Sequence, residues 1–237
     1  MLTDHRRALR FSVGLLVCLG FMLIAVGRHP EELAPRTTLQ LVGDLDAAVE
    51  RWVAGIRVDV LTGLFTFLSI VGGGLVTIPL RVAVATWLLY RRRFVALATF
   101  VVAWAASEAL LTWLKLFFHR GRPPDPLVDT VGFSFPSGHA TAGAALAVVL
   151  VLVLLPPGPR RRSWEFGALA FSFVMALSRV YLAAHWFSDV VTGVLLGAGI
   201  ALGAAALVTE ITNVLSARGT IPRPPTPPGD PLDPRLS

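Results

Sequence analysis

The sequence is poor in the charged residues that cover the surfaces of soluble proteins. Only 15% of its 237 residues are charged, whereas 54% are hydrophobic and the mean hydropathy is +0.68. Soluble domains usually carry about 25% charged residues. The shortage of charge argues against a soluble protein. Apolar runs of about 20 residues recur along the chain, which is typical of membrane-spanning helices.

Cysteine and lysine are each present only once. Cys18 lies in the first apolar run, so an intrachain disulfide is excluded and redox chemistry is not suggested. Of the 21 basic residues, 20 are arginine and one is Lys115. A single lysine in so arginine-rich a chain suggests a position that needs a compact ammonium rather than a planar guanidinium.

The net charge of +6 does not indicate a nucleic-acid partner, because the arginines fall in short clusters between apolar runs. With six spans, all these clusters lie on one side, which the positive-inside rule assigns to the cytoplasm. We therefore expect a multi-pass protein of the cell membrane with both termini cytoplasmic. The clusters are at residues 6–10, 91–93, 160–162 and 218–235.

The expected fold is all-α: a polytopic membrane protein built as a bundle of six transmembrane helices. An N-terminal transmembrane helix occupies residues 1–27, and an extracytoplasmic connection with an amphipathic helix occupies 28–59. The polar motifs described below fall in a membrane core at 60–209. Residues 210–237 form a cytoplasmic tail, whose many prolines predict disorder.

Two segments need closer interpretation. The second span, from Leu61 to Tyr90, is interrupted by Gly72, Gly73 and Gly74, so we expect one tilted or broken helix. In the 28–59 connection, apolar side chains recur at helical spacing, which predicts an amphipathic helix that lies on the membrane surface or packs against the bundle. These side chains are Leu45, Val49, Trp52 and Ile56.

Three short polar motifs stand out from this apolar background. The first runs from Lys115 to Pro123 (KLFFHRGRP), the second is Pro136-Ser-Gly-His139, and the third runs from Ser178 to Asp189 (SRVYLAAHWFSD). Ionisable groups near a bilayer are costly and are usually functional. Together the motifs supply cations, two imidazoles and a carboxylate, which are the functional groups needed to bind a phosphate and attack its phosphorus atom.

The third motif contains a candidate nucleophile. His185 and Asp189 are four residues apart, so on a helix they share a face. A carboxylate on one imidazole nitrogen fixes the tautomer and leaves the other nitrogen free to attack. A histidine–aspartate pair alone is often structural. Arg179, six residues upstream, favours the catalytic interpretation.

The second motif falls where a helix begins. Ser137 is a natural N-cap and Gly138 permits a close approach of backbone to ligand, so the free N–H groups form an anion site. His139, in the first turn, can face the same anion and protonate a leaving oxygen. A serine nucleophile with a histidine base remains an alternative at Ser137, although a capping hydroxyl is already committed to backbone N–H groups.

In order and spacing, the three motifs resemble those of the type 2 phosphatidic acid phosphatase family, over roughly residues 46–207. The resemblance implies a phosphohistidine mechanism with His185 as nucleophile, Asp189 as its orienting partner and His139 as the acid. The phosphoryl oxygens would be held by Lys115, Arg122 and Arg179. Ser137 and Gly138 would complete the phosphate site.

We expect no cofactor and no metal. His119, His139, His185 and Asp189 could nominally bind zinc, but three cations in the same motifs would repel a divalent ion. His119 and Arg120 have no motif position and are interpreted as loop or headgroup contacts. Within the spans, Glu108 is expected to bond another helix or Lys115, and Arg81 to extend toward the cytoplasmic surface.

The sequence thus predicts a metal-independent integral membrane lipid phosphatase with its active site on the extracytoplasmic side. Its partners would be the bilayer and a lipid phosphate or diphosphate. Phosphatidic acid, phosphatidylglycerophosphate and polyprenyl diphosphate are equally compatible with the motifs. A lipid phosphotransferase and a non-catalytic lipid-phosphate binder or transporter are the alternatives. Binding alone, however, needs neither His139 nor the His185–Asp189 pair.

Overall fold

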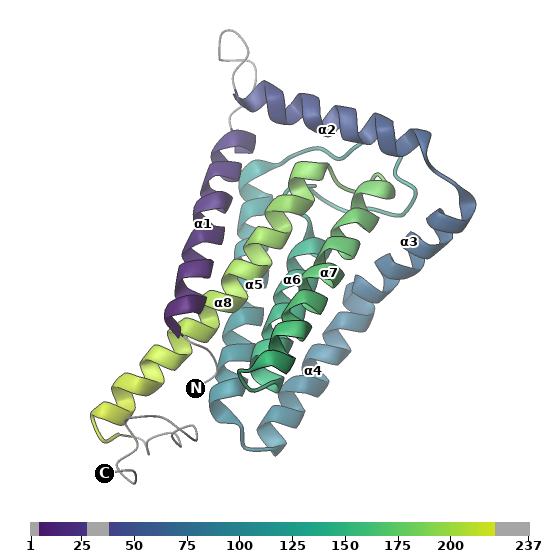
Figure 1. Cartoon of the computed structure of the whole chain (residues 1–237). Coiled ribbons are helices and arrows are strands. Elements are labelled where there is room, and N and C mark those ends of the chain that lie inside the picture. Colours follow the sequence, from purple (N-terminus) through teal and green to yellow (C-terminus); the bar gives the residue numbers. More distant parts are fainter. Residues whose placement is uncertain (1–4, 28–37, 221–237) are drawn as a thin grey trace.

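In the computed structural model, which describes residues 5–27 and 38–220, the chain forms eight α-helices and no strand within those residues (Figure 1). An all-α fold is therefore confirmed. The helices are α1 (His5–Gly27), α2 (Thr38–Gly55), α3 (Asp59–Gly72), α4 (Gly74–Tyr90), α5 (Phe94–Phe118), α6 (Gly138–Leu154), α7 (Pro159–Tyr181) and α8 (Phe187–Ala217).

The second expected span is a broken helix, as the three consecutive glycines suggested. Helix α3 ends at Gly72, Gly73 is extended with φ −76° and ψ 166°, and α4 begins at Gly74. Helix α7 packs closely here, since a Cβ at Gly72 would come within 2.6 Å of the terminal methyl carbon of Met175 and the end of that flexible side chain would have to move.

Helix α2 lies across one end of the bundle (Figure 1). Its inner row is formed by Asp46, Val49 and Val53, three and four residues apart, and Val53 packs in the core beside α7 and α8. Leu45 and Trp52 belong to the row that sequence periodicity singled out, and both are exposed. The helix therefore packs against the bundle and also presents an apolar row outward.

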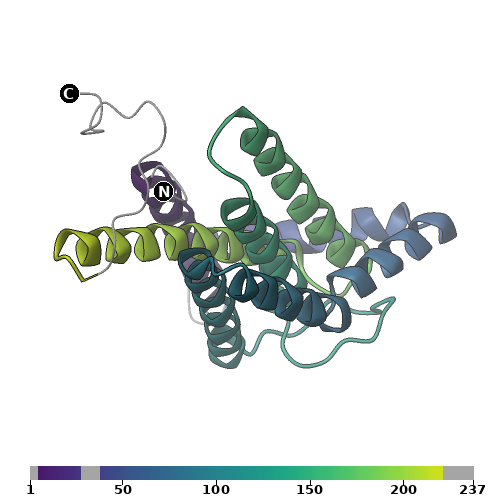
Figure 2. The same cartoon turned by 90° about the horizontal axis from the view of Figure 1, so that it is seen from below.

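Helices α6 and α8 form the centre of the bundle. Helix α6 packs against α5, α7 and α8, and α8 is tilted across its neighbours (Figure 2). The close contact between α6 and α8 depends on glycine. A Cβ at Gly193 would lie 2.8 Å from the carbonyl oxygen of Ser137, and one at Gly197 would overlap the carbonyl oxygen of Thr141. This packing sets the start of α6 against the start of α8.

The length and composition of the described helices are those of a membrane protein. Three segments within the described ranges are long and apolar enough to span a bilayer: Asp59–Tyr90, Phe94–Phe118 and Phe187–Ala217. Gly138–Leu154 and Leu9–Gly20 are shorter apolar helices, and α7, which opens on Arg160–Arg162, does not meet the same criteria. The count of six spans therefore stays a prediction.

The arginine clusters lie at the end of the bundle opposite α2. Arg91–Arg93 join α4 to α5, Arg160–Arg162 open α7, and Arg218 follows α8 (Figure 1). The boundary expected at residue 209 falls inside α8, which continues to Ala217. The rest of the expected tail, from residue 221, and the 28–37 part of the connection lie outside the described residues.

Candidate active site

The three polar motifs meet at the α2 end of the bundle. Lys115 lies in the last turn of α5, and Arg122 follows in the connection to α6. His139 is in the first turn of α6, Arg179 in the last turn of α7, and His185 just before α8. The helix ends that carry these residues come from four helices, so only the folded bundle brings them together.

His185 and Asp189 lie beside each other as expected, although His185 Nδ1 is buried without a hydrogen-bond partner among the described residues. His185 Nδ1 lies 3.5 Å from Asp189 Oδ2, and the two side chains are 3% and 0% exposed. His185 lies one residue before Trp186, the N-cap of α8, so the pair spans the helix start rather than sharing a helix face. Asp189 is held in place by the Trp186 N–H, which donates to Oδ2 at 2.9 Å.

Arg122 occupies the other side of the imidazole. Its Nη1 lies 3.3 Å from His185 Nε2 and donates to the carbonyl oxygen of Ala184 at 2.6 Å. Its Nη2 donates to the carbonyl oxygens of Val131 (2.8 Å) and Phe133 (3.3 Å). Lys115 Nζ donates to the same Phe133 oxygen at 2.8 Å. One carbonyl thus holds Lys115 and Arg122 together beside His185.

His185 is neutral at ordinary pH. Burial lowers the pKa of its imidazole to about 4, against the opposing effect of Asp189 and with a further lowering by Arg122 and Arg179. Burial also lowers the pKa of the Arg122 guanidinium, which Asp189 partly offsets. A neutral imidazole with Nε2 turned toward a guanidinium has a lone pair available where an anion would be held.

Ser69 links the remaining two motif residues. His139 Nε2 donates to the carbonyl oxygen of Ser69 at 3.1 Å, and Arg179 Nη1 donates to the Ser69 hydroxyl. The backbone carbonyl of Arg179 accepts the N–H of His185 at 3.2 Å, which connects this group to the histidine pair. Arg179 Nε is buried with no hydrogen-bond partner among the described residues.

The Pro136–His139 motif is organised as a helix cap. Ser137 Oγ accepts from the Ala140 N–H at 3.5 Å, and the Ser137 N–H donates to the Asp189 carbonyl at 3.0 Å. Ser137 is completely buried. The space around Gly138 gives no steric reason for glycine, since an added Cβ would meet only the Leu111 side chain, at 3.6 Å.

Arg120 is not the loop or headgroup contact that the sequence suggested. Its guanidinium donates to Asp189 Oδ1 at 2.5 Å and to Asp46 Oδ2 at 2.7 Å. Sequence reasoning missed this pairing, because Arg120 has no motif position and Asp46 lies 74 residues away in α2. The helical spacing of Asp46, Val49 and Val53 was the feature of the sequence that could have indicated that Asp46 faces the bundle. His119 packs edge-on against Phe133.

Two charged residues inside the spans pair with each other. Arg81 Nη1 donates to Glu108 Oε1 at 2.5 Å, and the Arg81 guanidinium carbon lies 5.4 Å from the ring centroid of Trp104. Arg81 is buried, so the expectation that it extends to the cytoplasmic surface was wrong. Glu108 makes the interhelical bond that was expected of it, with Arg81 rather than Lys115 as its partner.

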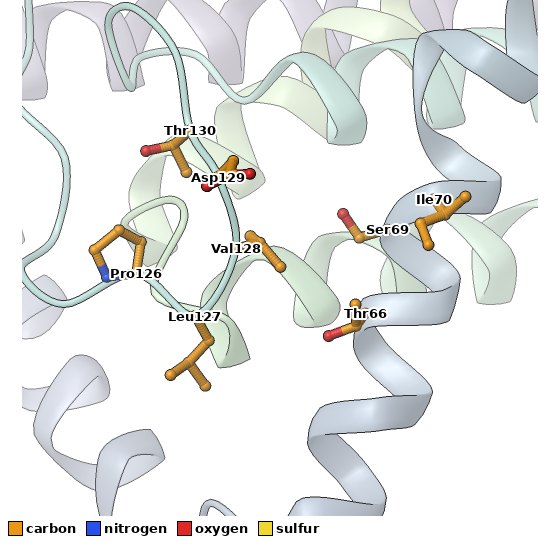
Figure 3. A pocket seen from close by; sticks show the side chains of 8 residues that line it. All are labelled: Thr66, Ser69, Ile70, Pro126, Leu127, Val128, Asp129 and Thr130. Atoms are coloured by element: carbon orange, nitrogen blue, oxygen red, sulfur yellow. The ribbon is translucent and has the colours of Figure 1, made fainter.

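An open groove of about 730 Å³ adjoins this cluster, between α3 and the loop before α6. Figure 3 shows Thr66, Ser69 and Ile70 on the helix facing Val128 and the rest of the loop. Ser69 belongs both to the groove and to the group that holds His139 and Arg179. The complete lining is Thr66, Ser69, Ile70, Pro126, Leu127, Val128, Asp129 and Thr130.

In residues 5–27 and 38–220, no three His, Cys, Asp or Glu side chains gather as a metal site would require. The charges that converge on His185 are mainly cationic: Lys115, Arg122 and Arg179. This donor set suits an anion with several oxygens, since arginine and lysine N–H groups supply charge-assisted hydrogen bonds.

Comparison with known proteins shows the family to which the chain belongs. Residues 96–213 match the model of the PAP2 superfamily. Phosphatidylglycerophosphatase B of Bacillus subtilis is 27% identical over 170 residues, covering 70% of this chain and 84% of the relative. Undecaprenyl-diphosphatase of Sulfolobus acidocaldarius is 30% identical over 151 residues, covering 61% and 69%. A crystal structure of a PAP2-type phosphatidylglycerolphosphate phosphatase from B. subtilis superposes with a TM-score of 0.70 at 25% identity, over 86% of this chain and 96% of that one.

Proposed function

Because the chain belongs to the PAP2 superfamily, we propose that it is an integral membrane phosphatase that removes a phosphoryl group from a lipid phosphate. The observation that carries the proposal is the position of His185 between Asp189 and Arg122. One ring nitrogen is turned to a carboxylate and the other to a cation that can hold the phosphate. Binding alone would not require that arrangement.

In the first step His185 Nε2 attacks phosphorus. Its lone pair forms the N–P bond as the bond from phosphorus to the leaving oxygen breaks, and His139 gives that oxygen a proton. In the second step water attacks phosphorus and the N–P bond breaks. His139 takes the proton from the water, so the enzyme returns to its starting state. Asp189 stabilises the charge that develops on the imidazole.

The cations perform the electrostatic part of the reaction. Lys115, Arg122 and Arg179 would contact the non-bridging phosphoryl oxygens, where negative charge redistributes in the transition state. They supply the positive charge that a divalent metal provides in other phosphatases, so we propose that turnover needs no metal. Lys115 and Arg122 are fixed by hydrogen bonds to backbone carbonyls, and Arg179 by its bond to the Ser69 hydroxyl, before substrate arrives, so little reorganisation accompanies the reaction.

The groove beside Ser69 would receive the leaving group. His139, the proposed acid, is held by the Ser69 carbonyl, and Ser69 lines the groove. The eight described lining residues include Asp129 and three hydroxyls, and no lysine or arginine. A carboxylate there disfavours a leaving group that is itself a phosphate. We therefore expect lipid phosphomonoesters to be better substrates than polyprenyl diphosphates.

The test is phosphate release by the purified protein in detergent. The substrates are phosphatidic acid, phosphatidylglycerophosphate and a polyprenyl diphosphate, each assayed with excess chelator, with His185→Ala as the matched inactive control. We expect release that survives chelation and is lost in the variant. No release from any substrate would contradict the proposal, and release restored only by a specific divalent ion would overturn metal independence. Adding glycerol or a sugar separates hydrolysis from transfer to a hydroxyl.

Asp129→Asn tests the groove. Removing its charge should raise kcat/KM for the diphosphate relative to the monoester, while Asp125→Asn, exposed in the same loop, should leave the ratio unchanged. If Asp129→Asn leaves the ratio of the two kcat/KM values unchanged, the groove does not receive the leaving group. The phosphatase proposal would not be affected.

A further inference from the structure

Arg120 forms a bridge between two buried carboxylates. Its Nη1 donates to Asp189 Oδ1 at 2.5 Å, and its Nη2 donates to Asp46 Oδ2 at 2.7 Å. Asp46 and Asp189 are 2% and 0% exposed, and the Arg120 guanidinium carbon lies 5.7 Å from the ring centroid of Trp186. The guanidinium fork reaches both acids at once, which a lysine ammonium at the end of a flexible chain would not reproduce.

Asp46 also holds the start of α8. Its Oδ1 accepts the Ser188 N–H at 2.8 Å, and its Oδ2 accepts the Ser188 hydroxyl at 2.6 Å. The first N–H groups of a helix have no partner inside that helix. One of them is satisfied here by a side chain from α2, directly before Asp189. The carboxylate beside His185 is therefore fixed through its neighbour Ser188 as well as through Arg120.

Without the bridge this arrangement would be costly. Two buried carboxylates would face each other with no cation between them, and a buried charge without a partner is strongly unfavourable. Asp189 would relieve the repulsion by shifting away from Asp46 while keeping its charge. That shift would change the angle at which its carboxylate meets His185 Nδ1.

We propose that Asp46 and Arg120 are positioning residues that orient Asp189 toward His185, so that the reactive pair forms only when helix α2 is seated on the bundle. The proposal rests on the proposed function, in which His185 is the nucleophile. Neither residue contacts the atoms that would hold phosphate, and neither belongs to the three motifs. The exposed apolar row of α2, including Leu45 and Trp52, lies beside the row that carries Asp46.

The positioning role of Arg120 can be recognised by its effect on the pKa of His185. The groups that face His185 are Asp189 from α8, Arg122 from the loop, Arg179 from α7 and His139 from α6, and Lys115 of α5 lies next to Arg122. Arg120 neutralises part of the Asp189 charge. Its removal should strengthen the field of the carboxylate at His185 and raise the pKa of the imidazole by about one unit. Loss of packing alone would not produce that shift.

The experiment compares Arg120→Gln, Arg120→Lys, Asp46→Asn and the double variant Asp46→Asn/Arg120→Gln. Arg120→Gln should lower kcat by about 100-fold, the scale on which a misplaced catalytic group acts, with KM within about twofold of wild type because the phosphate contacts are intact. The acid limb of kcat/KM should move up by about one pH unit. Arg120→Lys should recover part of kcat, and the double variant should lose no more than Arg120→Gln, because the pair acts as one unit.

Matched controls come from the same end of the bundle. Asp44→Asn changes an exposed acid of α2, and Arg57→Gln changes an arginine that donates to the Tyr181 carbonyl. Both should keep wild-type kcat and acid limb. Wild-type kcat with an unmoved acid limb in folded Arg120→Gln would overturn the proposal. If that variant does not fold, Arg120→Lys and Asp46→Asn carry the same test.

A second readout separates this proposal from the phosphatase assignment. Histidine-labelled protein can be titrated by nuclear magnetic resonance, with the His185 signal identified from its loss in His185→Ala. An upward shift of the His185 midpoint in Arg120→Gln supports the bridge even if the wild type hydrolyses none of the lipids tested. If the His185 midpoint does not shift and the wild-type enzyme is active, the proposed role of the Arg120 bridge is wrong and the phosphatase proposal stands.

Discussion

Arg122 Nη1 lies 3.3 Å from Nε2 of His185, on the opposite side of the ring from Asp189. The imidazole is therefore placed between a carboxylate and a guanidinium, with each nitrogen turned to one of them. An arginine at this distance cannot take a proton from the ring, but it can hold a phosphoryl oxygen beside the attacking nitrogen. This relationship predicts which substitutions near His185 will be tolerated.

Substitutions of Arg122 should show whether catalysis needs only its positive charge or also its planar guanidinium group. Arg122→Ala should lower kcat/KM by about 100- to 1,000-fold, the range seen when a transition-state donor is removed. Arg122→Lys should recover only a small part, because one ammonium cannot also contact the Ala184, Val131 and Phe133 carbonyls. Steady-state kinetics measure both. Arg57→Ala is the control, and full activity of Arg122→Lys would show that the planar fork is unnecessary.

The pH profile should show a nucleophile that stays neutral in mild acid. Because burial lowers the pKa of His185 to about 4, the acid limb of kcat/KM should fall near pH 4, after correction for ionisation of the substrate. An ordinary histidine, with pKa about 6.5, would already lose about thirty-fold at pH 5. A limb near 6.5 in the free enzyme would mean that the nucleophile is not the buried His185.

The same shift has a consequence for stability. The folded-state pKa of His185 lies below its unfolded value, so between about pH 6.5 and pH 4 the unfolded chain binds the additional proton. Stability from this group should therefore fall as pH falls through that window. His185→Ala, which has no such group, should show a weaker decline of melting temperature across it.

The Arg81–Glu108 pair should matter for stability rather than for catalysis. Glu108→Ala leaves the buried Arg81 guanidinium, inside an apolar span, without its half-exposed carboxylate partner, and leaving a buried charge unpaired in this way costs about 3 kcal/mol. The Arg161–Glu165 pair has much the same exposure, but it is an i,i+4 pair at the polar start of α7 and Arg161 has a further contact, so Glu165→Ala should cost about 0.5 kcal/mol or less. Thermal unfolding in detergent measures the difference. Arg81→Met/Glu108→Leu should restore most of the loss, whereas equal losses for the two single Glu variants would contradict the pairing.

Much of the architecture could be predicted because it depends on local sequence. Apolar runs bounded by proline, glycine and arginine gave the positions of the helices, and the glycines at 72–74 marked the break between α3 and α4. The residues that converge on His185 could be identified because they sit in motifs with fixed spacing. Their positions at neighbouring helix ends follow from the up-and-down order of the helices.

The pairings that were missed join residues far apart in the chain. Arg81 and Glu108 are 27 residues apart on different helices, and Asp46 and Arg120 are 74 apart. No local pattern pairs such residues. On α2, the regular row that includes Leu45 and Trp52 drew attention to the exposed face, while the buried row contains an acid and so looked less apolar. The periodicity of apolar residues cannot detect a buried charged residue whose partner lies on a distant part of the chain.

Topology can be tested with single cysteines. The loop that carries Asp129 lies at the end of the bundle opposite Ser163, in the first turns of α7 (Figure 1). In a Cys18→Ser background, Asp129→Cys should react with an impermeant thiol reagent in intact cells, and Ser163→Cys only after lysis, because arginine clusters favour the cytoplasm. Reaction of Ser163→Cys from outside would invert the topology and place the substrate in the other leaflet.

The final prediction concerns the residue that carries the phosphoryl group. Ser137 is a conceivable rival to His185, because His139 is only two residues away. The Ser137 hydroxyl, however, is already engaged as a helix cap, since it is completely buried and accepts the Ala140 N–H at the start of α6. His185 Nε2, in contrast, faces Arg122, and Asp189 lies at the other ring nitrogen, where it can orient the imidazole. The attacking atom should therefore be a nitrogen.

The two adducts differ chemically, since a phosphohistidine is labile to acid and stable to base, whereas a phosphoserine has the reverse behaviour. Rapid quenching with a phosphorus-labelled substrate should trap an acid-labile adduct, most abundant in His139→Gln, where the water that resolves the intermediate lacks its base. The matched control is His185→Ala, which should trap none. An acid-stable label at Ser137 would make His185 a general base. The overall reaction would stay the same, but Asp189 would then orient a proton acceptor instead of a nucleophile.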